Sequence, residues 1–438
     1  MTFTNQKAKA SYHTLGCKLN FAETASIQRE LEELGVTGIS GDETPDICLV
    51  NTCSVTAMAD KKARTLIRGL ARRYPEAAII VTGCYAQLRP EEAAALPGVE
   101  MVVGSEHKGN IAQLVDRWLS FRDKTMQVTS LKEIRNFHGS CERGDRTRFF
   151  LKVQDGCNYY CSYCTIPFAR GMSRSGKIAD IAAMAKEAAS RGGKEIVITG
   201  VNVGEFGKDH GEKFLDLLKT LDETEGIERF RISSIEPNLL TEEILEWIAG
   251  SSRRFMPHFH IPLQSGSDKV LQMMRRKYDT SLFSSRIEMI RQLMPDAFIG
   301  VDIIAGAHGE TEEEWEKSLE FATGLDISRF HVFPYSEREG TRALGLGDRV
   351  QSEVRHKRAA ILTRLSDEKL SQFFKRNLQS VRPVLWETIT AKGKMQGLTD
   401  NYLRVEAQGD ATFLNTVSNA RLTSMNEKRN DMANAIPE

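Results

Sequence analysis

Hydrophobic residues follow two different spacings along the first 120 or so residues of the chain. Short apolar runs, typical of β-strands, alternate with segments whose apolar residues lie three or four positions apart, as in helices. The predicted strands are residues 11–15, 46–51, 78–82 and 101–103, and the predicted helices are residues 21–34, 55–73 and 111–121. Strands that alternate with helices form a parallel sheet, so this region predicts an α/β domain.

A polar stretch of mixed charge, residues 122–147, is predicted to be a linker, with Gly139 and Gly144 as turn signals. A second series of strand-like runs follows, at residues 149–154, 195–201, 230–233, 258–261, 298–304 and 329–333. The helical segments between them are residues 178–190, 214–221, 241–248 and 312–322. Six strands with intervening helices predict a partial (β/α)6 barrel of the TIM type, with its chemistry at the C-terminal ends of the strands.

The last part of the chain has a different pattern. A long amphipathic helix is predicted at residues 352–377, and residues 383–417 then alternate β-branched and polar side chains. Turn signals lie at Lys392-Gly393, Gly397, Asp400-Asn401 and Gly409-Asp410. This pattern predicts a small antiparallel β-barrel of four or five strands. The expected domains are residues 9–122, residues 143–375 and residues 376–432.

Composition narrows the class of protein. The chain has 438 residues, of which 41% are hydrophobic and 27% charged, and its net charge of zero argues against coating nucleic acid by bulk charge. Residues 1–10 are polar, without an apolar signal core, and no stretch of about 18 apolar residues exists. We therefore expect a cytoplasmic protein without a membrane span. In that compartment its eight cysteines serve as ligands or free thiols rather than disulfides.

Three cysteines, Cys157, Cys161 and Cys164, lie within eight positions directly after a strand-like run. Three thiolates at this spacing can hold three irons of a four-iron cluster and leave the fourth iron open to a small molecule. A structural zinc site needs four ligands, and no fourth Cys or His lies within about ten residues. Disulfide frameworks are typical of small secreted domains rather than of a chain this long. The triplet therefore favours an iron–sulfur cluster.

Three further cysteines share a position in the first domain. Cys17, Cys53 and Cys84 each follow a predicted strand of one parallel sheet, at the edge where α/β sheets bind ligands. Three buried thiols are the alternative, because Cys is often buried. The repeated position after strand ends favours a shared metal site. Cys48 lies inside an apolar strand and is predicted to be a core residue, and Cys141 lies in the linker without ligand-like neighbours.

Basic residues recur at three- and four-residue steps along the predicted helix 55–73, which places them on one helical face. They are Lys61, Arg64, Arg68 and Arg72, flanked by Lys62 and Arg73. Residues 61–75 contain no acidic residue. Such a stripe is usually a solvated face, but the lack of compensating acids leaves a nucleic-acid contact open.

Residues beyond the cysteines follow the pattern of a known family. After the triplet these are Tyr163, Pro167, Arg170, Gly171 and Arg174, and a second block runs from His260 to Ser267. With both cysteine sets, the chain resembles the radical S-adenosylmethionine methylthiotransferases over nearly its whole length. Its tail resembles a TRAM domain, an RNA-binding β-barrel. One block departs from the family, because its usual Gly-Phe-Pro-Gly-Glu is Gly306-Ala307-His308-Gly309-Glu310 here.

The segment around Cys17 narrows the resemblance. Gly16-Cys17-Lys18-Leu19-Asn20, followed by Glu23-Thr24, is similar to the MtaB type, which modifies N6-threonylcarbamoyladenosine at position 37 of tRNA. Relatives that modify isopentenyladenosine usually have Gln and Met after this cysteine, and those that modify a ribosomal-protein aspartate have Pro and Lys. Those two targets are alternatives. A non-catalytic, zinc-containing RNA-binding protein is the alternative from a different class.

The resemblance implies replacement of the hydrogen on adenine carbon 2 by a methylthio group, which requires a radical because no side-chain base removes that hydrogen. It implies two [4Fe-4S] clusters. One, on Cys157, Cys161 and Cys164, binds and cleaves S-adenosylmethionine, and the other, on Cys17, Cys53 and Cys84, presents sulfur. A second S-adenosylmethionine supplies the methyl group. The implied partners are tRNA, a reductant such as flavodoxin or ferredoxin, and a sulfur donor, with the enzyme acting as a monomer.

Candidate contacts to S-adenosylmethionine lie near strand ends of the barrel, where each could instead cap a helix or satisfy a loop. They are Tyr163, Arg174, Gly200, Asn202, Ser234, Glu236 and Gln264, with Arg174 expected to pair with the methionine carboxylate. RNA affinity is expected to be shared. Residues 371–438 carry nine basic residues against seven acids, so the basic helix and Arg275-Arg276-Lys277 should contribute.

Overall fold

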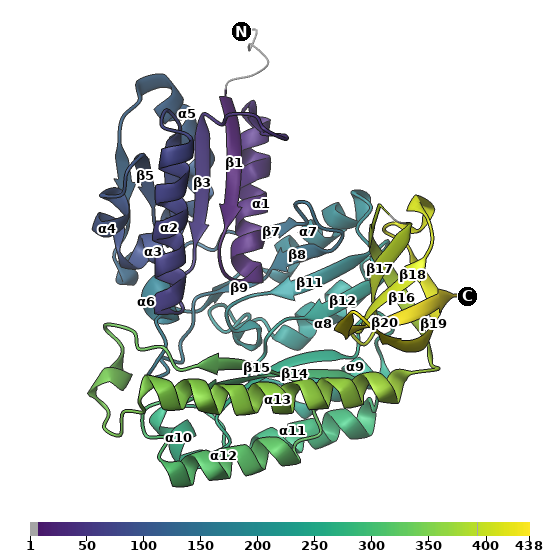
Figure 1. Ribbon diagram of the computed structural model, residues 1–438. Coiled ribbons are helices and arrows are strands. Elements are labelled where there is room, and N and C mark those ends of the chain that lie inside the picture. The colour runs from purple at the N-terminus through teal and green to yellow at the C-terminus, as the bar shows by residue number, and fades with distance from the viewer. Residues whose placement is uncertain (1–7, 392) are drawn as a thin grey trace.

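The computed structural model describes residues 8–391 and 393–438, in three parts (Figure 1). A parallel α/β domain stands above an open barrel of strands and helices, and a small closed β-barrel lies beside the open barrel at the C-terminal end. Two predictions fall partly outside the described residues: the absence of a signal core concerns residues 1–7, and the predicted Lys392-Gly393 turn includes Lys392.

The N-terminal sheet confirms the predicted α/β domain. Its six parallel strands have the order β2-β1-β3-β4-β5-β6. They are β1 (Ala8–Thr14), β2 (Val36–Gly38), β3 (Ile47–Thr52), β4 (Ala78–Gly83), β5 (Val99–Val103) and β6 (Thr125–Gln127). Side chains alternate along β3, so Leu49 faces one layer of helices and Cys48 the other. Cys48 is fully buried, which confirms it as a core residue.

Two layers of helices cover this sheet. Helices α1 (Lys18–Glu33) and α5 (Ile111–Phe121) pack on one face, and α2 (Ala57–Arg73), α3 (Cys84–Leu88) and α4 (Pro90–Ala94) on the other. Helix α2 begins where the Thr56 hydroxyl accepts a hydrogen bond from the Ala59 amide. Such a cap stabilises a helix by about 1 kcal/mol. A 3₁₀ turn, η1 (Ser105–Asn110), precedes α5.

The predicted linker, residues 122–147, is in fact structured. Strand β6 extends the first sheet, η2 (Leu131–Glu133) is a 3₁₀ turn, and β7 (Ser140–Glu142) pairs antiparallel with the first barrel strand. Three-residue strands carry too few apolar positions to show a period, and edge pairing holds them instead. Cys141 is buried with the core of the barrel rather than free in a loop.

The six predicted barrel strands are all present, in two sheets. Strands β8 (Phe149–Lys152), β11 (Glu195–Thr199) and β12 (Arg229–Ile232) are parallel, as are β13 (His258–Gln264), β14 (Phe298–Ala305) and β15 (Arg329–Pro334). Isolated bridges from Phe230 to Phe255 and from Ser234 to His260 connect the sheets. The barrel is therefore an open arc. A short antiparallel pair, β9 (Gln154–Asp155) and β10 (Arg174–Ser175), flanks the cysteine triplet.

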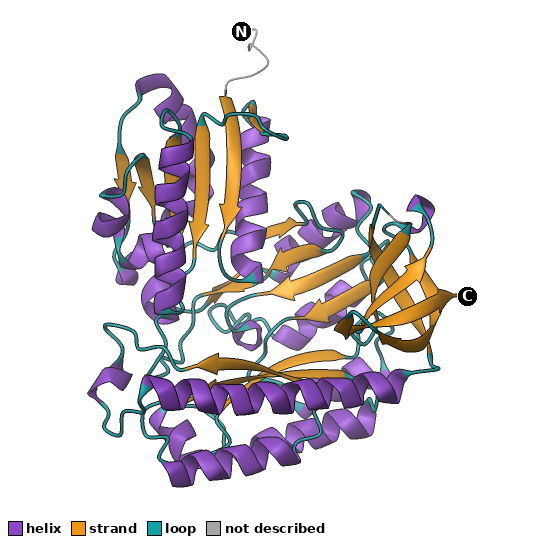
Figure 2. Cartoon of the chain, in the orientation of Figure 1, coloured by secondary structure: helices purple, strands orange, loops and turns teal. Residues whose placement is uncertain are grey.

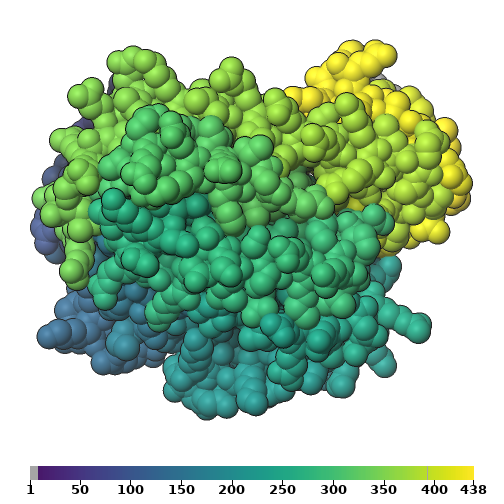
Figure 3. All heavy atoms as spheres, turned by 90° about the horizontal axis from the view of Figure 1, so that it is seen from below, coloured from purple at the N-terminus to yellow at the C-terminus, as the bar shows by residue number. Residues whose placement is uncertain are grey.

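Helices cover the outside of the arc (Figure 2). They are α7 (Ile178–Ser190), α8 (Phe214–Asp222), α9 (Glu242–Gly250), α10 (Asp268–Met273), α11 (Thr280–Leu293) and α12 (Glu312–Gly324), with η3 (Val203–Glu205) between β11 and α8. Helix α6 (Ile166–Arg170) instead lies against α3 of the N-terminal domain. The sequence did not predict α10 or α11, although both have capping residues, Ser267 and Asp279. Seen from below, the molecule presents mainly these barrel segments, with the C-terminal barrel at one edge (Figure 3).

The 3₁₀ turn η4 (Arg342–Gly345) is followed by helix α13 (Ser352–Asn377), which has its predicted bounds. Helix α13 runs along β15 and ends at the C-terminal barrel. That barrel is closed in the order β16-β17-β18-β20-β19. Its elements are β16 (Val381–Ile389), β17 (Lys394–Thr399), β18 (Arg404–Gln408), η5 (Ala411–Phe413), β19 (Val417–Asn426) and β20 (Arg429–Pro437). The predicted pattern ended at residue 417, too early by two strands, because β19 and β20 carry polar side chains that mask alternation.

Two smaller predictions concern single turns. Gly397 does not form a turn but lies inside β17, where a Cβ atom would collide with the Leu385 carbonyl oxygen. The altered block from Gly306 to Glu310 does form a turn, because both of its glycines adopt positive φ and Glu310 accepts a hydrogen bond from the Gly306 amide at 2.6 Å. Among the helices of the described residues, none is long and apolar enough to cross a membrane.

Candidate functional site

The cysteine triplet lies in the loop between β9 and α6, where backbone amides approach its sulfur atoms. The Tyr159 amide donates to Cys157 Sγ at 3.5 Å, and the Ile166 amide donates to Cys164 Sγ at 3.4 Å. Gly156 precedes the triplet with φ +70°, and a Cβ atom there would collide with the Met172 carbonyl oxygen. Only glycine therefore allows this loop to close, and the loop then presents donors that stabilise thiolates.

A buried arginine from a distant segment completes this surrounding. Arg276 Nη1 donates to Cys161 Sγ at 3.1 Å, and Nη2 pairs with the Glu236 carboxylate. Burial, with the neighbouring thiols, raises the pKa of Cys157 and of Cys164 to about 12 each. Thiols with so high a pKa are protonated near neutral pH and ionise only when a metal group takes the place of the proton.

The N-terminal cysteines meet at one edge of the first sheet. Cys17 caps α1 after β1, Cys53 follows β3, and Cys84 begins α3 after β4. These strands are neighbours in the sheet, so their C-terminal ends converge. A Cβ atom on Gly16 would lie 2.6 Å from Cys53 Cβ, which shows how closely two of the loops pack. Burial, reinforced by Cys84 and Cys17, raises the pKa of Cys53 to about 12.

Asn20 holds two of these loops together. Its side-chain amide donates to the Leu15 carbonyl at 2.8 Å and to the Thr52 carbonyl at 3.0 Å, while its oxygen accepts from Arg170 Nη2 at 2.6 Å. Asn20 is 1% exposed, so all three contacts are sheltered from water. The residue therefore fixes the segments that precede Cys17 and Cys53.

Both cysteine sets fit an iron–sulfur cluster by the chemistry of their donors. Within residues 8–391 and 393–438, no group of three or more His, Cys, Asp and Glu side chains is arranged to hold a single metal ion. Each set instead offers three thiols that lie within range of one another's charge, as their mutual effects on pKa show. Sulfur-only ligation and amide donors to the sulfur atoms are features of cluster sites.

A buried network of charges lies between the two cysteine sets. Glu23 on α1 pairs with Lys108, with Lys152 at 2.8 Å and with Arg170 at 3.0 Å. Asp155 on β9 pairs with Lys152 at 2.7 Å and with Arg170 at 2.9 Å. Burial alone would raise the pKa of Glu23, but Arg170, Lys108 and Lys152 hold it well below its usual value. The network thus locks the N-terminal domain to the barrel by charge pairing.

Arg170 also reaches the N-terminal cysteines. Its charge lowers the pKa of Cys84 against the larger effect of burial, and a hydrogen bond between the two side chains acts in the same direction. Arg170 follows the triplet in sequence, on α6, and contacts Asn20 and Cys84 of the other domain. One guanidinium therefore links the surroundings of both cysteine sets.

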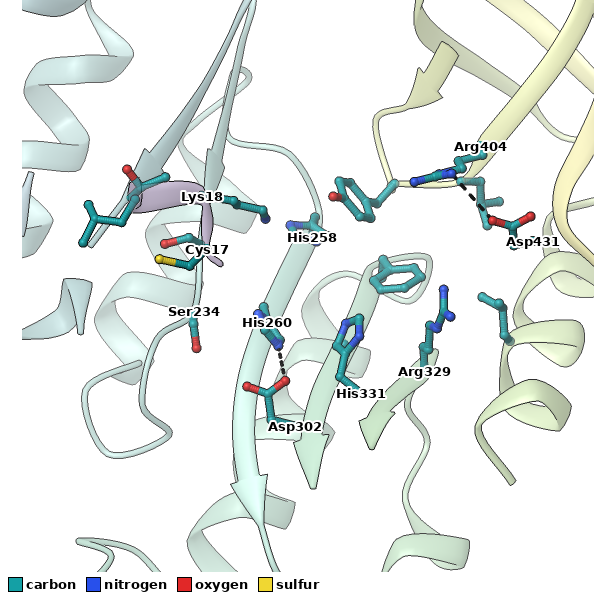
Figure 4. A pocket seen from close by; sticks show the side chains of 18 of the residues that line it. Cys17, Lys18, Ser234, His258, His260, Asp302, Arg329, His331, Arg404 and Asp431 are labelled. Carbon is teal, nitrogen blue, oxygen red and sulfur yellow. Dashed lines mark hydrogen bonds and ion pairs between the residues drawn. The ribbon is translucent and has the colours of Figure 1, made fainter. Parts of the chain in front are cut away.

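A cavity of about 550 Å³ opens beside Cys17, between the three parts of the chain (Figure 4). The N-terminal domain contributes Cys17 and Lys18, and the C-terminal barrel contributes Tyr402, Arg404 and Asp431. The barrel strands contribute its remaining polar walls: Thr199, Ser233, Ser234, His258, His260, Asp302, Arg329 and His331. The sequence did not single out the cavity, because its walls are far apart along the chain.

The predicted contacts to S-adenosylmethionine lie in different surroundings. Gly200 and Ser234 line the cavity. Asn202 is 3% exposed, and a hydrogen bond from its side chain lowers the pKa of Tyr159 against the larger effect of burial. Gln264 ends β13 with φ +68°, a strained conformation for a non-glycine residue. Glu236 is occupied by Arg276, and burial raises its pKa.

Tyr163 and Arg174 are placed around the cluster loop. The Tyr163 hydroxyl lies 3.5 Å from Arg276 Nη1. Arg174 donates to the carbonyls of Asn136 at 2.7 Å, Arg170 at 2.7 Å and Met172 at 3.2 Å, and faces Asp155 at 3.4 Å. Its guanidinium thus braces the loop, and these contacts give no support to a pairing with the methionine carboxylate.

The expectation that Arg275-Arg276-Lys277 binds RNA is wrong for its middle residue. Arg276 is buried against Glu236 and Cys161, because the loop after α10 turns it inward. Arg275 and Lys277 remain exposed, with Lys277 over the Tyr159 ring at 4.2 Å. The three residues are all basic and adjacent in the sequence, so the sequence alone does not show which of them is buried.

Comparison with known proteins defines the class to which the fold and the cysteine loop belong. Residues 151–322 match the radical SAM superfamily, and residues 9–104 match a family described as uncharacterized protein family UPF0004. The radical S-adenosylmethionine methyltransferase TsrM from Kitasatospora setae has the same fold over 74% of this chain and 72% of its own, with a TM-score of 0.55 and 14% identity. The protein is thus of the radical SAM class, which implies S-adenosylmethionine and a [4Fe-4S] cluster.

Full-length relatives are more specific. The threonylcarbamoyladenosine tRNA methylthiotransferase MtaB of Bacillus subtilis is 37% identical over 95% of this chain and 94% of its own length. MtaB of Thermotoga maritima is 37% identical over 91% of each chain. A tRNA-2-methylthio-N(6)-dimethylallyladenosine synthase of Clostridium tetani is 29% identical over 96% of this chain and 94% of its own. The chain belongs to the MtaB family of threonylcarbamoyladenosine tRNA methylthiotransferases.

Proposed function

We propose that this protein transfers a methylthio group to carbon 2 of N6-threonylcarbamoyladenosine at position 37 of tRNA. The observation that carries the proposal is the full-length similarity to MtaB proteins together with the cysteine sets on either side of one locked joint. Similarity to the dimethylallyladenosine enzymes is lower, at 29% identity, so isopentenyladenosine remains the second candidate.

The proposal assigns one [4Fe-4S] cluster to each cysteine set. When bound, the two clusters and S-adenosylmethionine supply the one-electron chemistry and the sulfur that side chains cannot supply. Cys157, Cys161 and Cys164 hold the first cluster, and Arg276 stabilises negative charge on Cys161. The buried side chain of Asn202 and the backbone at Gly200 are suited to orient S-adenosylmethionine at the ends of the barrel strands.

The second set supplies the site of sulfur transfer. Cys17, Cys53 and Cys84 hold the auxiliary cluster, and Cys17 lies at the wall of the cavity. Asn20 and Arg170 position the loops that carry these thiols. The cavity would receive the target nucleotide, because Cys17 lies in its wall and the auxiliary cluster, when bound there, would supply the sulfur.

The remaining assignments follow from this chemistry. The auxiliary-cluster domain, expected at residues 9–122, is assigned to the first sheet, which ends with β6 at Gln127. The radical SAM barrel, expected at residues 143–375, begins with β7 at Ser140 and includes α13 to Asn377, and the RNA-binding barrel, expected at residues 376–432, extends to the end of β20 at Pro437. The substrate tRNA, a reductant such as flavodoxin or ferredoxin and a sulfur donor are the proposed partners of a cytoplasmic monomer.

The proposal is tested with anaerobically reconstituted full-length protein and an anticodon stem-loop RNA carrying threonylcarbamoyladenosine. Mass spectrometry should detect the methylthio nucleoside from the wild type. The Cys84→Ala variant should lose this product but still release 5′-deoxyadenosine, and Cys164→Ala should lose both. Cys141→Ala, a buried thiol outside both sets, should keep both and serves as the matched control.

Two results would contradict the proposal. Colourless protein loaded with zinc would exclude the radical chemistry, whereas about eight irons are expected for two four-iron clusters. Preferential methylthiolation of an isopentenyladenosine RNA would replace the substrate by the second candidate.

A further inference from the structure

Two basic side chains in the cavity wall have no acidic partner. Within the described part of the chain, neither Lys18 nor Arg329 forms an ion pair, and Arg329 Nε is buried without a hydrogen-bond partner. The two acidic residues that line the cavity have other partners: Asp302 faces His260 Nε2 at 2.8 Å, and Asp431 pairs with Arg429 at 3.1 Å. Both residues are half-buried in the cavity wall, so their charges are only partly solvated and an anion from outside the chain would stabilise them.

The pKa values of other titratable groups in the cavity are lowered in part by this positive charge. Burial together with Arg231 and Lys18 holds the pKa of His258 well below its usual value, and burial with His260, Arg329 and Lys18 lowers that of His331 to about 4. Both imidazoles are therefore neutral near pH 7. Burial would raise the pKa of Tyr402, but Lys18, Arg148 and Arg231 lower it to about 8. The charge of Lys18 thus lowers the pKa of His258, His331 and Tyr402, and the positive potential that it creates in the cavity favours an anion.

His258 supplies a second and independent sign of a missing ligand. The residue is 5% exposed, lines the cavity and packs against Tyr402, with ring centroids 4.1 Å apart and ring planes tilted by 36°. Its Nδ1 atom is buried without a hydrogen-bond partner in the described residues. Buried polar atoms are almost always satisfied, so a polar group of a ligand is expected there.

The position of Lys18 fixes which part of the ligand it meets. Lys18 follows Cys17 directly, and both side chains line the cavity (Figure 4). In adenine, carbon 2 and the carbon that carries N6 are both bonded to N1. When carbon 2 faces the sulfur site at Cys17, a substituent on N6 that folds toward N1 lies beside the same loop. In threonylcarbamoyladenosine this substituent ends in a carboxylate.

We propose that Lys18 binds the threonyl carboxylate of the substrate and so forms the subsite that selects threonylcarbamoyladenosine over neutral adenosines. The subsite rests on the proposed function, because it takes the N6 substituent of that substrate. Arg329 adds to the field from β15, on another wall of the cavity. An ammonium group on a flexible stem suits this role, because its three donors can turn to meet the carboxylate.

The test compares binding of three anticodon stem-loop RNAs to anaerobically reconstituted full-length protein. One RNA carries threonylcarbamoyladenosine at position 37, one carries its methyl ester, and one carries unmodified adenosine. The wild type should bind the free carboxylate roughly tenfold to a hundredfold more tightly than the ester, as expected for a hydrogen-bonded charge pair. This comparison needs no variant and so is independent of folding.

Variants then assign the effect to one residue. Lys18→Gln should bind all three RNAs with similar affinity, while Lys18→Arg should retain most of the preference for the carboxylate. Lys186→Gln, an exposed lysine on α7, is the matched control and should behave as the wild type. Iron content, measured in parallel, identifies any variant that has lost a cluster.

Several outcomes would overturn the subsite. Equal affinity of the wild type for the acid and the ester excludes carboxylate recognition. Equal loss for all three RNAs in Lys18→Gln shows that Lys18 binds a backbone phosphate instead. Loss of discrimination in Arg329→Gln but not in Lys18→Gln moves the subsite to β15. Failure of the proposed function is seen separately, as absence of methylthio product from a wild type that still discriminates between acid and ester.

Discussion

Single residues of this protein act across long distances in sequence. Arg276 is 115 positions from the sulfur atom to which it donates, and Arg170 is 150 positions from Asn20. Both are buried guanidinium groups: Arg276 stabilises negative charge on a cysteine sulfur, and Arg170 fixes the geometry of a loop. Lys18 acts over a much longer span of the sequence, because its charge lowers the pKa of Tyr402 in the C-terminal barrel.

The tyrosine gives a spectroscopic test of the cavity field. We expect one of the nine tyrosines to deprotonate near pH 8, against an ordinary value near 10, and Tyr402→Phe to remove this transition. An unfolded tyrosine keeps its proton to a higher pH. The free energy of unfolding should therefore gain a contribution from Tyr402 as the pH rises from about 8 to about 10.

The measurement is a pH titration of phenolate absorbance in the near ultraviolet, taken as the difference between the wild type and Tyr402→Phe. Lys18→Gln should move the transition to higher pH because one cation is removed. Identical titration curves for the wild type and Tyr402→Phe below pH 9 would show that the field is absent.

At the residue scale, the sequence predicts which cysteines belong together better than it predicts which side chains contact them. The spacing of Cys157, Cys161 and Cys164 and the strand-end positions of the other set are local signals, and the structure brings each set together. The bracing role of Arg174 and the burial of Arg276 depend on contacts made only after folding. Sequence spacing carries no information about which cation turns inward.

Elements with a regular period were predicted well, and short elements were not. Helix α7 and helix α13 have the predicted bounds, because their apolar stripes extend over several turns. Strands β6 and β7 have only three residues each, and they lie in the segment that the sequence predicts to be a linker. Pairing with a neighbouring strand, which no local pattern reports, holds both in place.

Helix α2 shows how the structure sharpens a prediction about an element. The basic stripe is present, but Arg64 pairs with Glu92 of α4 at 3.0 Å, so the lack of acids within the helix is partly compensated from outside. Arg68 and Arg72 are exposed and form no ion pair with other described residues. They are thus the better probes of a nucleic-acid contact.

We expect the double reversal Arg68→Glu/Arg72→Glu to weaken binding of tRNA and to reduce the slope of log affinity against log salt concentration, because fewer phosphate contacts release counterions. Both cysteine sets should keep their iron. Lys186→Glu/Lys219→Glu on α7 and α8 makes the same change of charge on a different face and is the control. Equal affinities of the two double variants would exclude α2 from the RNA interface.

At the scale of the whole molecule, the order of the three parts along the chain could be predicted, but not how they join. Alternating strands and helices indicate two α/β units, and the turn-rich tail indicates a barrel. The joint consists of buried ion pairs between Glu23 and residues of the barrel, and the cavity lies where all three parts meet. Charged residues in a sequence are normally assigned to the surface, so their pattern hides such a joint.

Removal of one member of the joint should be costly. We expect Arg170→Met to lower the free energy of unfolding by about 3–5 kcal/mol, because it leaves two buried carboxylates with fewer partners. Arg253→Met, at an exposed position, should change it by less than about 0.5 kcal/mol. Denaturant unfolding of both variants provides the comparison. An Arg170→Met protein as stable as the control would show that the joint depends on packing rather than on charge.

The division of the cavity among three walls has a consequence for how such enzymes diversify. None of the three cysteines of the triplet lines the cavity, whereas Lys18 lies in its wall and is the residue that we propose to face the substituent that distinguishes one adenosine from another. A mutation in that wall can change which nucleoside is preferred without altering the cysteines that hold the clusters. Evolution can therefore explore new substrates by single steps, each of which begins from a working catalyst.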